Sequence, residues 1–145
     1  MGILYNITCR NKDCRYHFEE RVGPGWTLRR WIFDLRKEII DGEEKAPQEI
    51  VEMLKKGCKL HCVSTFLCPT CKEWQTHDDP YIFEPIVVSP YGTIREYKIH
   101  YVYGTPVCEK CGTELEYIIN PRSSKCNCPK CGEDNMKVSF CGYYD

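Results

Sequence analysis

The apolar positions of one early segment recur with a helical period. From Thr27 to Gly42 the chain reads TLRRWIFDLRKEIIDG, with apolar residues at steps of three and four. This spacing places them on one face of an amphipathic helix. Thr27 is of a type that caps a helix N-terminus, and Gly42 stands where a helix would end. The pattern therefore predicts a helix here, with this apolar face: Leu28, Trp31, Ile32, Leu35 and Ile39.

A second helix is predicted directly after the first. Pro47 suits the first turn of a helix, and Gly57 is a stop signal ten residues later. Between them the chain supplies four apolar contacts: Ile50, Val51, Met53 and Leu54. The two segments together predict a helical insertion at about residues 26–57, which would cover one side of neighbouring strands.

The remaining apolar runs are short and rich in β-branched and aromatic residues, which predicts strands. One pair would be joined by a turn at SPYG, and in its second strand aromatic residues alternate with Glu96, Lys98 and His100. We interpret this stripe as a core or an interface, because few positive charges lie between the rings on the same face. The expected strands are LYNIT, VSTFL, 114–119, 136–140, PYIFEPIVV and TIREYKIHYVY, the last with the stripe Tyr97, Ile99, Tyr101 and Tyr103.

The composition decides how such a small chain could hold together. A chain of 145 residues suits one domain or two very small ones, and small domains need additional cross-links. Twelve cysteines are available for them. The first residues contain no apolar signal segment, and no run reaches the about 20 apolar residues that span a bilayer. We therefore expect a cytoplasmic protein without a membrane partner, in which cysteines bind metal rather than form disulfides.

Four cysteines near the C-terminus have the spacing of a zinc site. They form CEKCG and CPKCG, with sixteen residues between the two pairs. A tight turn across each CxxC pair can direct both sulfur atoms at one point, and the glycine that follows permits the chain to turn back sharply. The predicted ligands of this first site are Cys108, Cys111, Cys128 and Cys131.

A second site is predicted from two less regular pairs. The first is CRNKDC, which has four residues between its cysteines, and the second is CPTC. Arg15 and Lys72 occupy the positions where a glycine would be expected. His17, Cys58 or Cys62 are alternative ligands. The predicted set is Cys9, Cys14, Cys68 and Cys71.

Other cysteines and histidines have no such spacing. A third site built from them is an alternative, as is an exchange of ligand between Cys126 and Cys128, but we interpret these cysteines as small buried side chains. Histidines are expected in polar or surface roles, although His17 has a spacing from Cys14 that would suit a ligand. The cysteines concerned are Cys58, Cys62, Cys126 and Cys141.

The motifs CEKCG and CPKCG resemble the paired knuckles of zinc ribbons and of rubredoxin-like domains. The order of motifs along the chain is similar to a group of small, uncharacterised bacterial proteins with two zinc ribbons. It comprises CRYHFEERVGPGW, a helical insert, CPTC, and the two C-terminal knuckles. The resemblance implies a double zinc-ribbon protein and brings no activity with it.

The fold class expected is α+β, small and metal-stabilised, with two zinc-ribbon or rubredoxin-like β units and a helical insertion in the first. We expect residues 1–90 to form the N-terminal unit and residues 91–145 the C-terminal one. Two Zn²⁺ ions per chain are expected, with iron as the alternative, because tetrahedral sulfur sites accept either metal.

Three classes of function fit these features. Structural Cys₄ sites favour a non-enzymatic binding or adaptor module with a protein partner, because four thiolates leave no open position on zinc. Nucleic-acid binding is less favoured, because eight thiolates and two Zn²⁺ ions take the formal charge of −1 to about −5. Iron or thiol redox chemistry is the third class. Catalysis would require a site with three cysteines or one that uses His17.

Overall fold

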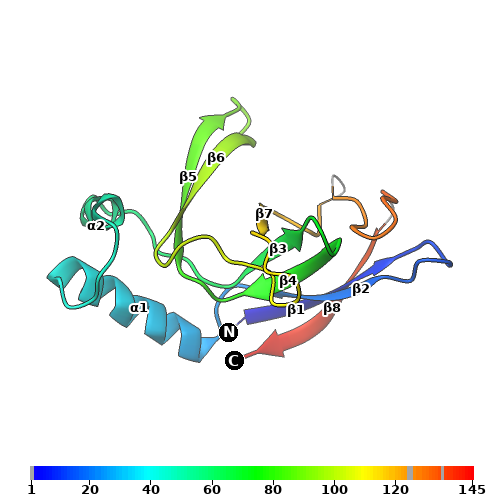
Figure 1. Ribbon diagram of the computed structural model, residues 1–145, viewed down its shortest axis with the longest axis horizontal. Coiled ribbons are helices and arrows are strands. Elements are labelled where there is room, and N and C mark those ends of the chain that lie inside the picture. The colour runs from blue at the N-terminus through cyan, green and yellow to red at the C-terminus, as the bar shows by residue number, and fades with distance from the viewer. Residues whose placement is uncertain (1, 124–125, 135) are drawn as a thin grey trace. The chain divides into compact units, whose positions relative to one another are not determined.

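The computed structural model describes residues 2–123, 126–134 and 136–145. The fold is α+β, as predicted, with two helices and small antiparallel sheets among these residues. The elements in chain order are β1 (Gly2–Cys9), β2 (His17–Val22), α1 (Trp26–Asp41), α2 (Gln48–Lys55), β3 (Ser64–Cys68), β4 (Glu73–His77), β5 (Tyr81–Val88), β6 (Ile94–Tyr101), β7 (Glu116–Ile118) and β8 (Met136–Tyr144) (Figure 1).

The chain forms two compact units, and each is built from separate stretches of sequence. Unit 1 comprises Met1–Thr27, Val63–Asp78 and Thr105–Asp145. Unit 2 comprises Leu28–Cys62 and Asp79–Gly104. This division differs from the predicted 1–90 and 91–145. The β5–β6 hairpin lies in the same unit as the helices. The predicted helical insertion therefore forms a unit together with this hairpin.

Unit 1 contains two sheets with the same plan. In one, the β1–β2 hairpin receives β8 on the free side of β1, in the order β2-β1-β8. In the other, the β3–β4 hairpin receives β7 on the free side of β3, in the order β4-β3-β7. All of these pairings are antiparallel. Each sheet thus combines a hairpin from an earlier part of the chain with one strand from a later part.

Aromatic contacts fill the interior of unit 1. Phe66 of β3 and Ile7 of β1 are fully buried. Trp74 of β4 meets Tyr16 and Phe18 edge to face, with ring centroids 6.1 and 5.6 Å apart. The Tyr16 hydroxyl accepts a hydrogen bond from the Trp74 backbone N–H at 2.8 Å. These contacts join the β1–β2 hairpin region to β4, but they form a small core for two sheets.

Unit 2 has its own apolar core, between the helices and the β5–β6 hairpin. Both predicted helices are confirmed. Thr27 lies inside α1, which begins at Trp26, and the Trp26 N–H donates to Asp145 Oδ1 at 2.7 Å. Gly42 and Gly57 follow the two helices in the left-handed conformation. The buried core residues are Leu35, Ile39, Ile50, Leu54, Leu60, Ile82 and Val102.

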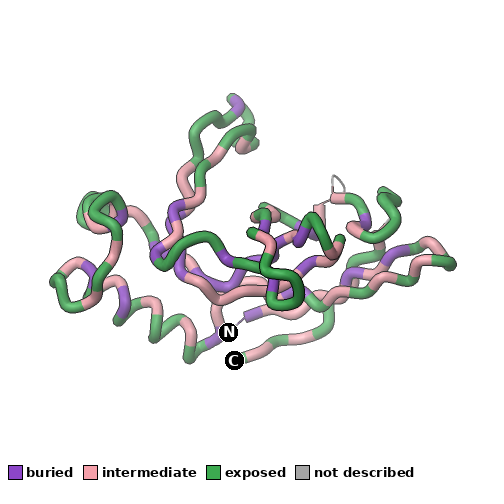
Figure 2. The backbone as a smooth tube through the Cα atoms, in the orientation of Figure 1, coloured by how far each residue is buried: buried purple, intermediate pink, exposed green. Residues whose placement is uncertain are grey.

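The β5–β6 hairpin presents two different faces along its length. Near its base Ile82 joins the core of unit 2, and His100 is buried between the carboxylates of Glu49 and Glu84. On the other face Phe83 and Tyr97 stack at 5.1 Å. The aromatic stripe is therefore half-buried along the strand. The half of the hairpin near its turn is mostly exposed (Figure 2).

No helix in the described part of the chain is both long enough and apolar enough to span a bilayer.

Candidate metal centres

Each of the four cysteine loops turns the chain back with a residue in the left-handed conformation. The residues concerned are Arg15, Lys72, Gly112 and Gly132, with φ of 51°, 54°, 75° and 81°. Glycine adopts this conformation freely, whereas other residues pay a steric cost. Arg15 and Lys72 depart from the glycine pattern in sequence but keep the same backbone geometry.

Three of the loops share one hydrogen bond across the turn. The N–H of the residue after the second cysteine donates to the carbonyl of the first cysteine, at 2.8 or 2.9 Å, in the loops of Cys68, Cys108 and Cys128. In the wider first loop the Arg15 N–H donates instead to the Asn11 carbonyl at 3.1 Å. Asn11 therefore occupies the place of a first cysteine in this turn. Cys9 lies two residues earlier, at the end of β1.

The sulfur atoms gather into two clusters of four. We call Cys9, Cys14, Cys128 and Cys131 the outer cluster, and Cys68, Cys71, Cys108 and Cys111 the inner cluster, because the inner residues lie between the outer ones in sequence. Within each cluster all four sulfur atoms lie within 4.8 Å of one another. In the described residues these are the two groups of three or more His, Cys, Asp or Glu side chains that could hold a metal ion.

The sulfur separations match a tetrahedral metal site. A Zn–S bond of about 2.3 Å places the sulfurs of a tetrahedron about 3.8 Å apart. Two sulfur pairs in the outer cluster are 3.5 and 3.7 Å apart, and two in the inner cluster are 3.6 and 3.9 Å apart. A disulfide would bring two sulfurs to about 2.05 Å. None of the eight cysteines in the two clusters forms a disulfide in the structure, so the donor sets fit a thiophilic cation.

The grouping of the eight cysteines corrects the predicted one. The sequence placed Cys108 and Cys111 with Cys128 and Cys131, and Cys9 and Cys14 with Cys68 and Cys71. In the structure, the β1–β2 hairpin shares its cluster with the Cys128 knuckle, because β8 pairs with β1. The β3–β4 hairpin shares its cluster with the Cys108 knuckle, because β7 pairs with β3. The strand that follows each C-terminal knuckle carries it to a different sheet. Strand pairing, rather than proximity in sequence, decides the ligand sets.

The alternative ligands lie outside both clusters. His17 Nε2 is 3.1 Å from Asn6 Oδ1. The Cys126 thiol donates to the Asn120 carbonyl at 3.1 Å, and Cys141 Sγ accepts from Asn6 Nδ2 at 3.5 Å. Cys58 and Cys62 belong to unit 2. A third site and an exchange of Cys126 for Cys128 therefore find no support in the described geometry.

The thiols in each cluster differ strongly in acidity. The Gln75 amide donates to Cys108 Sγ and lowers the pKa of that thiol to about 6, and the Glu133 N–H lowers the pKa of Cys131 to about 7. Burial raises the pKa of Cys9 to about 12. Four adjacent thiolates repel one another, so protons remain on some of them. A bound divalent cation would compensate this charge and displace those protons.

A small ion-pair network lies beside the inner cluster. Glu73 pairs with Lys110 at 2.7 Å and with Lys130 at 3.0 Å, and these bonds lower the pKa of the Glu73 carboxyl. Lys130 belongs to the outer CPKC loop, yet it also donates to the Cys71 carbonyl at 3.0 Å. Nothing in the sequence pattern indicated this link. It fixes the outer knuckle against the inner hairpin within unit 1.

Comparison with known proteins gives no relative for this chain: no protein family, no curated protein and no solved structure matches it.

Proposed function

We propose that this protein is a zinc-binding module, in which two Zn²⁺ ions hold unit 1 together and the folded module acts by binding a protein partner rather than by catalysis. The outer cluster would take one ion and the inner cluster the other. Each sheet with its knuckles would then be a zinc ribbon, with the inner ribbon inserted into the outer one.

The observation that carries this proposal is the complete donor set of both clusters. Each has four sulfur atoms at the separations of a tetrahedron, brought together by two loops. A structural zinc site is closed in this way, whereas a catalytic one keeps a position for water or substrate. Four thiolates therefore favour a structural role. Unit 1 also has a small apolar interior, and metal binding can supply folding free energy that the burial of so few side chains does not provide.

Two features favour a protein partner over a nucleic acid. With both sites loaded the formal charge is about −5, which opposes binding to a phosphate backbone. The β5–β6 hairpin also exposes apolar side chains near its turn, where Ile86, Val88 and Tyr91 are 50, 51 and 96% exposed. Exposed apolar groups of this kind mark sites of protein interaction more often than nucleic-acid contacts.

Metal analysis of protein purified without added metal tests the proposal. We expect a colourless protein with about two zinc ions per chain, because eight cysteines form two complete sites. Replacing zinc with Co²⁺ should give the visible spectrum of tetrahedral thiolate coordination. A red protein that contains iron would instead favour redox chemistry, and a protein that is folded but free of metal would contradict the proposal.

A further inference from the structure

The two clusters are matched in solvent access. In each, the first and third cysteines in chain order are buried, the second is half-buried and the fourth is exposed. Three of the four loops share one turn, and the wider first loop of the outer cluster ends in the same left-handed conformation. A reagent in solution would therefore meet one exposed cysteine in either site, and access alone gives no reason for the two sites to react differently.

The clusters differ in the side chains that donate to sulfur. Gln75 of β4 places its Nε2 2.9 Å from Cys108 Sγ in the inner cluster. The Thr113 hydroxyl also lies 3.2 Å from Cys111 Sγ, and 3.1 Å from the Thr70 hydroxyl. For the outer cluster, backbone N–H groups provide the hydrogen bonds, from Asn11, Tyr16 and Glu133. Within the described residues, the side chains that form hydrogen bonds with an outer sulfur are those of the other cysteines in the cluster.

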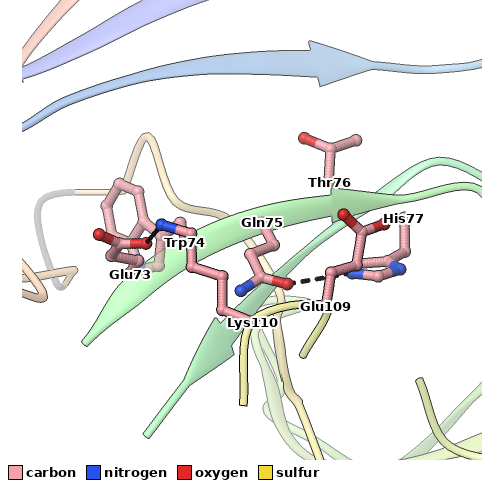
Figure 3. A pocket seen from close by; sticks show the side chains of 7 residues that line it. All are labelled: Glu73, Trp74, Gln75, Thr76, His77, Glu109 and Lys110. Carbon is pink, nitrogen blue, oxygen red and sulfur yellow. Dashed lines mark hydrogen bonds and ion pairs between the residues drawn. The ribbon is translucent and has the colours of Figure 1, made fainter. Parts of the chain in front are cut away.

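The Gln75 amide is held in one orientation. Its Oε1 accepts from His77 Nε2 at 3.3 Å, which leaves the NH₂ group to face the sulfur. The His77 ring is itself held edge-on against Phe66, with centroids 5.7 Å apart. Since residues two apart on a strand share a face, Gln75 and His77 project from the same side of β4, and Thr76 projects from the other (Figure 3). This pair lines a pocket of about 300 Å³ with Glu109 and Lys110.

We propose that Gln75 is a positioning residue for the inner metal, which makes the inner site more resistant than the outer one to metal release by thiol-directed reagents. This inference rests on the proposed function. Cys108 is buried, so the Gln75 amide acts on how firmly this ligand holds the metal rather than on attack at the exposed Cys111. A hydrogen bond to a metal-bound thiolate fixes the ligand and stabilises its charge, which slows loss of the metal after a reagent has modified the exposed ligand. Groups of this kind typically change metal affinity by about 10- to 100-fold.

Zinc release by N-ethylmaleimide, followed with a chromogenic chelator, tests the inference on the full chain. The wild type should release zinc in two phases of about one ion each. Gln75→Met keeps the length of the side chain but removes the donor, and it should speed the slower phase by about tenfold while leaving the faster one unchanged. Gln75→Glu, which places a negative charge beside the thiolate, should do the same. Thr76→Val, on the opposite face of β4, is the matched control and should behave as the wild type.

A spectrum of the Co²⁺-loaded protein provides a second readout that does not depend on chemical attack. Gln75→Met should shift the sulfur-to-cobalt charge-transfer band of one of the two ions. An unchanged spectrum and unchanged release, or an equal acceleration of both phases, would overturn the role of Gln75. Those outcomes in a protein that carries two zinc ions leave the proposed function standing, whereas a wild type that purifies without metal would refute that function itself.

Discussion

Removing both metal ions is expected to unfold unit 1. Each of its sheets has three strands, and β7 contains only three residues. Such short strands bury only a small apolar core, and domains with small cores are often held together by structural metal ions. Structural zinc sites provide about 10–16 kcal/mol of apparent binding free energy near neutral pH, and that free energy is coupled to folding. The loss of two ions should therefore exceed what the core around Phe66 and Trp74 can compensate.

Unit 2 provides the internal control for this experiment. Its core joins two helices to the β5–β6 hairpin and contains no residue of either cluster. When a strong chelator is added, amide resonances of Ile7 and Phe66 in a ¹H–¹⁵N spectrum should collapse to unfolded positions, whereas those of Leu54 and Ile82 should move much less. Added zinc should restore the original spectrum. Native-like dispersion of the unit 1 amides in metal-free protein would show that the metals are dispensable.

Replacing Arg122 with methionine should destabilise unit 1 by about 3 kcal/mol, the lower end for breaking a buried ion pair, because Arg122 is itself partly exposed. Arg122 Nε donates to Glu20 Oε2 at 2.9 Å, and its guanidinium lies 4.8 Å from the centroid of the Tyr5 ring. Glu20 is only 4% exposed. The substitution therefore leaves a buried carboxylate without its cation, which is more costly than the loss of a surface ion pair. Denaturant unfolding of the zinc-loaded protein measures the change.

The pH dependence of this variant has a definite sign. Burial raises the pKa of Glu20, and Arg122 opposes that rise. Without Arg122 the pKa of Glu20 should rise further, so the folded state binds a proton more readily than the unfolded state does. The stability of Arg122→Met should therefore fall as pH rises through the folded pKa of Glu20, and the deficit relative to wild type should be largest above it.

A second substitution separates the charge effect from packing. In Glu20→Gln combined with Arg122→Met, no buried charge remains, and the loss should shrink to about 1 kcal/mol. Equal losses in the single and the double variant, or a deficit that does not change with pH, would show that the Glu20 charge does not control stability here.

The helices could be predicted from sequence because their information is local. The period of Leu28, Leu35 and Ile39, with Gly42 as a stop, locates α1, and Pro47 and Gly57 bound the segment that contains α2. The eight cysteines of the two clusters were also identified from local spacing. Arg15 and Lys72 adopt the left-handed conformation in place of glycine, so the absence of glycine after these two cysteine pairs does not argue against metal binding there.

The division of those cysteines into two sites was not local information. Cys108 and Cys128 each begin a knuckle that precedes a strand, and either strand could complete either hairpin on apolar pattern alone. The choice is made by contacts between distant residues, such as Tyr5 with Phe140 and Lys130 with Glu73. The two discontinuous units were missed for the same reason. The β5–β6 hairpin is recognisable from its own sequence, but nothing local indicates that it packs with the helices in unit 2.

The ligand sets can be read directly from the protein loaded with ¹¹³Cd²⁺, which replaces zinc in thiolate sites. A ¹H–¹¹³Cd correlation spectrum connects each ion to the β-protons of the cysteines that bind it. Two cadmium resonances are predicted, one correlated with Cys9, Cys14, Cys128 and Cys131, and the other with Cys68, Cys71, Cys108 and Cys111. A single ion correlated with Cys108 and Cys128 together, or a chain that binds no cadmium, would contradict the account.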